Sequence, residues 1–138
     1  MKQILIERQG YSERIERMFG KGMVVALTGQ RRVGKSCVMR RIYEKYSQDS
    51  HNNVIYIDME KTAFAGITNY KDLEAYVAER LDSSKDNYLF IDEVQEIKDF
   101  EKAILSLQSD ESCQIMVTGS NAKMLSSELS TRLRGRYM

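Results

Sequence analysis

The chain has few of the residues that bind transition metals or form disulfides, with two cysteines, one histidine and no proline among 138 residues. Cys37 and Cys113 are isolated in the sequence, and His51 cannot complete a set of four zinc ligands with them. The sequence therefore excludes a zinc cluster. We expect both cysteines to be reduced, buried thiols of a cytoplasmic protein.

Long hydrophobic runs and an excess of one charge are also missing. No apolar run approaches the roughly 20 residues that a bilayer span needs, and residues 1–8 are too short an apolar segment for a secretory signal. We therefore expect no membrane partner. Lys and Arg number 21 against 20 Asp and Glu, so the net charge predicts no nucleic-acid partner. The composition predicts a single domain over 1–138.

The most informative stretch matches the phosphate-loop pattern G-x-x-x-x-G-K-[ST] at every fixed position, as Gly29-Gln30-Arg31-Arg32-Val33-Gly34-Lys35-Ser36. The apolar run 23–28 before it predicts a buried parallel strand. After it, apolar residues recur at helical spacing over 37–46. Strand, glycine loop and helix are the context that this motif requires, although a glycine turn with an incidental lysine would also contain these residues.

The motif predicts a site for a nucleotide polyphosphate. Its glycines let successive N–H groups face the phosphates, and the positive end of the following helix points at the same anion. Lys35 would reach the β- and γ-phosphates and contribute to catalysis, and the Ser36 hydroxyl would ligate Mg²⁺. We assign the whole loop and the next residue, Cys37, to nucleotide binding.

An apolar run over 88–93 predicts a strand that ends in two acids, Asp92 and Glu93. Asp92 would hold Mg²⁺, through water, and Glu93 would orient or deprotonate the attacking water. Apolar strands also end in acids at protein surfaces, but the phosphate loop earlier in the chain favours the catalytic interpretation.

Two further sets of residues have two interpretations each. Ser120 and Asn121 follow a strand predicted over 114–118, and they either sense the γ-phosphate or cap the next helix. Arg136, with Arg132 and Arg134, is either an arginine finger or part of a solvated basic helix end.

The remaining elements alternate along the chain. A strand is predicted over 54–58, and helices over 12–19, from Asn69 to about residue 81, over 100–109 and over 122–133. Segments 47–53, 62–68 and 83–87 are predicted as loops or turns. This alternation predicts an α/β sandwich with a parallel sheet.

Four motifs in this order resemble the prokaryotic AAA-type P-loop ATPases, specifically the group joined to a C-terminal nuclease-like domain: Leu27–Ser36, Tyr88–Gln95, Val117–Asn121 and Leu133–Arg136. The resemblance implies a three-layer α/β/α sandwich with a mainly parallel sheet of strand order 1-4-3-2. It also implies that this chain is the N-terminal core, without the family's fifth strand. The family usually has Thr at Ser36 and often Ser at Asn121, so either Ser120 or Asn121 is the sensor.

The resulting expectation is Mg²⁺-dependent hydrolysis of ATP, with ATP and Mg²⁺ as cofactors. The expected partners are the C-terminal domain of the full protein and further copies of the chain. Nucleic acid is expected as a partner only through the C-terminal domain, because this segment offers no basic and aromatic surface. The alternative is a switch that binds ATP with little turnover. A small-molecule kinase is a third class. The acid pair argues against it, because the pair supplies a base for water.

Overall fold

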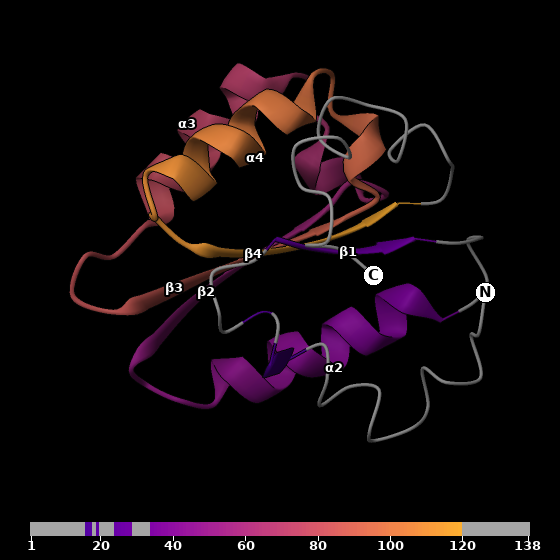
Figure 1. The fold of residues 1–138 in the computed structure, drawn as a ribbon. Coiled ribbons are helices and arrows are strands. Elements are labelled where there is room, and N and C mark those ends of the chain that lie inside the picture. Colours follow the sequence, from indigo (N-terminus) through magenta and orange to yellow (C-terminus); the bar gives the residue numbers. More distant parts are fainter. Residues whose placement is uncertain (1–15, 18, 20–23, 29–33, 120–138) are drawn as a thin grey trace.

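A four-stranded parallel sheet lies between two helical layers in the computed structural model, which describes residues 16–17, 19, 24–28 and 34–119 (Figure 1). The strands are β1 (Val25–Thr28), β2 (Asn52–Asp58), β3 (Asp86–Asp92) and β4 (Gln114–Gly119). Helix α2 (Lys35–Ser47) covers one face, and α3 (Tyr70–Arg80) and α4 (Phe100–Ser109) cover the other. The three-layer α/β/α architecture predicted from the sequence is confirmed.

The strand order is β1-β4-β3-β2, and every ladder is parallel, as predicted. Parallel pairing brings the carboxyl ends of all the strands to one edge of the sheet. The register sets Asp58 of β2 beside Asp92 of β3, and it pairs Ile91 of β3 with Val117 of β4. The carboxyl ends of β1 and β3 therefore lie at the same edge, with the end of β4 between them.

Alternation along the strands sorts the core into two clusters. Ile57, Ile91 and Val117 belong to the cluster that packs against α3 and α4, whereas Phe90 and Met116 pack against α2. The α2 cluster is closed by Val38, Met39 and Ile42, which recur at helical spacing on one side of that helix. On the same face, the buried polar residues Asp58 and Asp92 end β2 and β3, and the buried Thr118 is the last residue but one of β4.

Aromatic rings fill much of the space between α2 and the sheet. Phe90 is fully buried, and its ring centroid lies 5.3 Å from Phe19, 5.7 Å from Tyr43 and 6.2 Å from Tyr56. The Phe19 contact is tilted, the Tyr43 contact is edge-on and the Tyr56 contact is stacked, and aromatic pairs at these separations are stabilising. This cluster fixes α2 on the face of the sheet that carries the polar strand ends.

The predicted element bounds hold best for α4, whose residues are those of the predicted helix 100–109. β2 and β3 begin earlier than predicted, because Asn53 and Asn87 pair across the two strands. The Asn53 side chain donates to Asn87 Oδ1 at 2.7 Å and also to the Arg80 carbonyl. Cross-strand hydrogen bonds of this kind override the weak strand propensity of asparagine.

Two short 3₁₀ turns were not predicted. One, Thr62–Phe64, lies in the segment predicted as a loop, and the other, Val94–Glu96, directly follows β3 and Glu93. Of the helix predicted over 12–19, the described residues 16, 17 and 19 are helical. The helix predicted over 122–133 lies outside the described residues. In the described part of the chain, no helix has both the length and the apolar character needed to cross a bilayer.

We expect Phe90→Ala to lower the free energy of unfolding by about 3–5 kcal/mol, because it opens a cavity among the aromatic rings beneath α2. Urea unfolding measures the change at constant m-value. Phe64→Ala is the matched control: Phe64 is half-buried and packs edge-on against Tyr76, so its loss should cost clearly less. An equal decrease in the free energy of unfolding for both variants would show that Phe90 contributes no more to stability than a half-buried ring outside the cluster.

Candidate active site

Three segments that are far apart in the sequence meet at the carboxyl edge of the sheet, on the side of α2. The Ser36 hydroxyl, from the first turn of α2, donates to Asp92 Oδ1 at 2.8 Å. The Thr118 hydroxyl, from the end of β4, donates to the same oxygen at 2.5 Å. Asp92 is the last residue of β3 and is only 3% exposed. The structure therefore brings together the two predicted metal-binding residues, Ser36 and Asp92.

Thr118 is a member of this group that the sequence reasoning missed. It is fully buried, and its hydroxyl also accepts a hydrogen bond from the Glu93 N–H at 2.9 Å. In the sequence, Thr118 falls in the predicted strand 114–118 and in the motif Val117–Asn121, but neither assigns this residue a role in the site. The signal that would have found it is positional: in the predicted strand order, the end of the fourth strand lies next to the acids of the third.

Glu93 lies one residue beyond β3, not within it as predicted, and it adopts a left-handed backbone conformation with φ 59° and ψ 56°. Such a conformation is unfavourable for a residue with a Cβ, and it persists where the surroundings impose it. The side chain is 1% exposed, and its Oε1 accepts a hydrogen bond from Gln95 Nε2 at 2.6 Å. Its turn directs the chain away from the strand axis immediately after Asp92.

Further charged groups lie beside Asp92 on the α2 face. Asp58, its register partner on β2, is 3.8 Å from the Arg40 guanidinium and accepts the Glu60 N–H. Burial, and then the negative charge of Asp92, raise the pKa of the Tyr56 hydroxyl above its usual range, while Arg40 lowers it. The negative charge of Asp92 and the positive charge of Arg40 thus act on the pKa of the Tyr56 hydroxyl in opposite directions.

The start of α2 has the geometry of an anion site. Gly34 adopts φ 85°, a left-handed conformation that glycine takes at little cost, and it has no side chain that caps the helix. The first turn of α2 contains no acidic residue. By contrast, the Asn69 side chain caps α3 by accepting the N–H groups of Lys71 and Asp72. Among the described residues, no side chain caps the start of α2, so its first N–H groups could serve an external acceptor such as a phosphate.

The donor set fits Mg²⁺, a hard cation that prefers oxygen ligands. Both hydroxyl hydrogen bonds to Asp92 go to Oδ1, and among the described residues none goes to Oδ2. Neither hydroxyl uses Oδ2, so this oxygen is free of the two hydrogen bonds that hold Oδ1 and could bind a cation or a cation-bound water. Ser36 and Asp92 would hold the metal.

The remaining predicted site residues are distributed as follows. Lys35 is the first residue of α2 and so begins the helix at the same edge of the sheet. Gly29–Val33, Ser120, Asn121 and Arg136 lie outside the described residues. The prediction that both thiols are buried is right for Cys113 and wrong for Cys37, which is exposed. Cys37 falls opposite the side of α2 that carries Val38, Met39 and Ile42.

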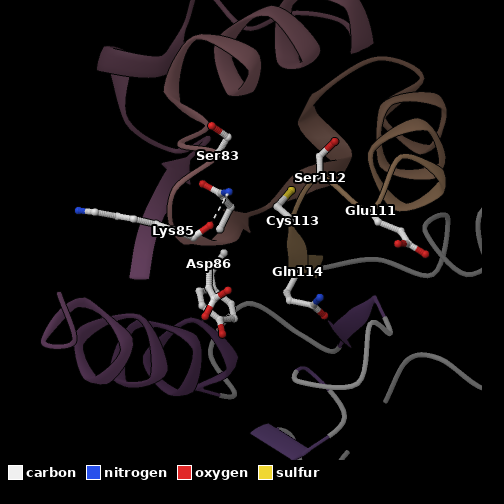
Figure 2. Close-up of a pocket in the computed structure, with 9 residues that line it drawn as sticks. Ser83, Lys85, Asp86, Glu111, Ser112, Cys113 and Gln114 are labelled. Carbon is white, nitrogen blue, oxygen red and sulfur yellow. Dashed lines mark hydrogen bonds between the residues drawn. The ribbon is translucent and has the colours of Figure 1, made fainter. Parts of the chain in front are cut away.

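A cavity of 480 Å³ lies at the opposite edge of the sheet, at the amino ends of β3 and β4 (Figure 2). Its lining includes Asp86, Cys113 and Gln114, and the Lys85 and Glu111 side chains extend away on opposite sides. Burial raises the pKa of the Cys113 thiol to about 12, so the thiol is protonated at neutral pH and is a poor nucleophile. Because the cavity lies at the amino ends of the strands, it is separate from the acid site at their carboxyl ends.

The sheet order, the glycine-led helix and the hydroxyl–carboxylate contact define the class of α/β folds built on a phosphate loop. A family model described as an AAA domain matches residues 21–138, and the chain belongs to that family. The match includes the segment from the phosphate loop to Arg136.

Two similar proteins have no assigned function. An uncharacterized protein of Haemophilus influenzae is 30% identical over 142 residues, an alignment that covers 100% of this chain and 35% of that protein. An uncharacterized protein of Methanocaldococcus jannaschii is 32% identical over 115 residues, covering 83% of this chain and 25% of that protein. The chain thus spans only about a third or a quarter of the length of these relatives.

Solved structures share the fold. Cdc6p from Pyrobaculum aerophilum superposes with a TM-score of 0.73 at 12% identity, over 96% of this chain and 44% of that one. PCH-2 of C. elegans superposes with a TM-score of 0.59 at 15% identity, over 96% of this chain and 38% of that one. At these identities the likeness shows the fold alone.

We expect a thiol reagent at pH 8 to label Cys37 rapidly in the native protein and Cys113 only slowly, because Cys113 is buried and its thiol stays protonated. Absorbance of the released chromophore counts the reactive thiols before and after unfolding in urea. In Cys37→Ser, the rapid phase should vanish and one thiol should appear on unfolding. Rapid labelling of native Cys37→Ser would contradict the burial of Cys113.

Proposed function

We propose that the chain binds ATP with Mg²⁺ and hydrolyses it to ADP and phosphate. The observation that carries this proposal is the 2.8 Å hydrogen bond from the Ser36 hydroxyl to Asp92, which joins the end of the phosphate-loop motif to the acid strand. Membership of the AAA domain family supports nucleotide binding by the same residues.

The Ser36 hydroxyl has one hydrogen, and it donates that hydrogen to Asp92. The lone pairs of its oxygen are therefore available to Mg²⁺, and Oδ2 of Asp92 is available to the metal or to a metal-bound water. When bound, Mg²⁺ would neutralise charge on the β- and γ-phosphates. Gly29–Gly34 and the N–H groups of Lys35, Ser36 and Cys37 would hold the phosphates, with the Lys35 ammonium on the β- and γ-phosphate oxygens.

In the proposed reaction, a water oxygen attacks the γ-phosphorus while the bond to the β–γ bridging oxygen breaks. Glu93 accepts the water's proton, and the electron pair of the broken bond stays on ADP. Glu93 is suited to this role because its backbone is fixed beside Asp92 and its carboxylate is held by Gln95. Ser120 or Asn121 would contact the γ-phosphate, and Arg136 would stabilise its charge in the transition state.

We extend the proposal to the whole protein, because this chain spans only part of the length of its relatives. We propose that ATP turnover drives a further, C-terminal domain, which the length of the relatives supports. A nuclease-like domain there, self-association of the ATPase units and a cytoplasmic location are parts of the same proposal. Any contact with nucleic acid would belong to that further domain.

Nucleotide titration tests the binding step. We expect the full-length protein to bind ATP more tightly with Mg²⁺ than with a chelator. Lys35→Ala should weaken binding by about tenfold or more, because a charge-assisted contact to phosphate is lost. Lys45→Ala is the control: Lys45 lies in the last turn of the same helix, paired with Glu16, and its loss should leave affinity unchanged. Equal affinity in all three proteins would contradict the assignment of the phosphate loop.

Phosphate release tests the chemical step. We expect Glu93→Gln to lower kcat by about 100-fold or more while ATP still binds, because a carboxamide cannot take the proton from water. Glu96→Gln is the matched control, since Glu96 is exposed in the adjacent turn and should turn over like the parent. Turnover by Glu93→Gln at the parent rate would remove Glu93 as the base. Tight binding without turnover by the parent would favour a switch, and a phosphorylated acceptor would favour a kinase.

A further inference from the structure

We propose that Thr118 is a positioning residue for this hydrolysis, a role that rests on the proposed function. Thr118 lies outside both the phosphate loop and the acid pair. Its hydroxyl connects the side chain of the metal-binding acid to the backbone of the catalytic base. It would therefore set the geometry of Asp92 and Glu93 together.

The hydrogen bonds define how this hydroxyl is used. Thr118 Oγ1 accepts the Glu93 N–H at 2.9 Å and gives its own hydrogen to Asp92 Oδ1. Asp92 Oδ1 then has two hydroxyl donors, Thr118 and Ser36. With Oδ1 occupied in this way, the carboxylate is held in one orientation, and Oδ2 is the oxygen left for the metal. Thr118 thus acts on the metal through Asp92.

The second bond acts on Glu93. The chain leaves β3 at Glu93 in a left-handed conformation, which is unfavourable for glutamate and needs support from neighbouring groups. The Thr118 hydroxyl supplies one such support from an adjacent strand, and it is fully buried, so water does not compete for it. Loss of this acceptor would loosen the backbone that positions the proposed base.

The fold makes this contact specific to residue 118. Val117, its neighbour, faces the core beneath α3 and α4, whereas Thr118 faces the α2 side with Asp92. β4 is also the strand that leads into Ser120 and Asn121, the proposed γ-phosphate contacts. One hydroxyl at the end of β4 therefore connects that strand to both acids.

The experiment compares Thr118→Val, which keeps the shape and removes the hydroxyl, with Thr118→Ser, which keeps the hydroxyl. In the full-length protein, we expect Thr118→Val to raise the Mg²⁺ concentration for half-maximal turnover by about 10- to 100-fold, as loss of groups that orient metal ligands does elsewhere. Its kcat at saturating Mg²⁺ should also fall. ATP affinity measured with a chelator should stay at the parent value. Thr118→Ser should restore most of the Mg²⁺ response.

Val117→Ala controls for damage to the fold. It removes buried atoms from the same strand on the opposite face, so it should lower the unfolding midpoint and leave the Mg²⁺ response unchanged. A parent-like Mg²⁺ response and kcat in Thr118→Val would overturn the positioning role, as would equal shifts in Thr118→Val and Val117→Ala. Failure of the parent itself to bind ATP in the presence of Mg²⁺ would instead overturn the proposed function.

Discussion

The carboxylate of Asp92 sits where the sheet, the first turn of α2 and the end of β4 meet, and its burial constrains all three. A carboxylate that is 3% exposed is costly unless polar groups compensate its lost hydration. Here the compensation comes from Ser36 and Thr118, whose hydroxyls reach the same oxygen. These contacts require α2 to start at the carboxyl edge of the sheet and β4 to lie next to β3. The strand order and the placement of α2 both satisfy this requirement.

Alternation along the strands lets one face of the sheet serve both stability and chemistry. Phe90 and Asp92 are two residues apart on β3 and therefore face the same side. The first lies in the aromatic cluster under α2, and the second holds the first turn of that helix. The packing of the aromatic rings thus fixes the helix whose start would carry the phosphates. The opposite face, under α3 and α4, has an apolar core and leaves the site to one side of the sheet.

The sequence predicts the strongly patterned elements well and the site only in part. The bounds of α4 follow from its apolar periodicity, and the convergence of Ser36 and Asp92 follows from the phosphate-loop and acid motifs. Local reasoning could not predict the turn at Glu93 or the early starts of β2 and β3. These depend on tertiary hydrogen bonds, from the Glu93 N–H to Thr118 and from Asn53 to Asn87. The exposure of Cys37 was missed although it follows from the helical phase of its neighbours.

The position of β4 between β1 and β3 places Thr118 next to the acid at the edge of the sheet. β1 precedes the phosphate loop in the chain and β3 ends in Asp92. Neighbouring strands are about 4.8 Å apart, so the ends of β1 and β3 are separated by about 10 Å. That gap accommodates the end of β4, where Thr118 is the buried polar side chain between the two segments. An aliphatic residue there would fill the space equally well, but it would leave Asp92 with one hydroxyl donor instead of two. The inserted strand therefore contributes a hydrogen bond that packing alone would not supply.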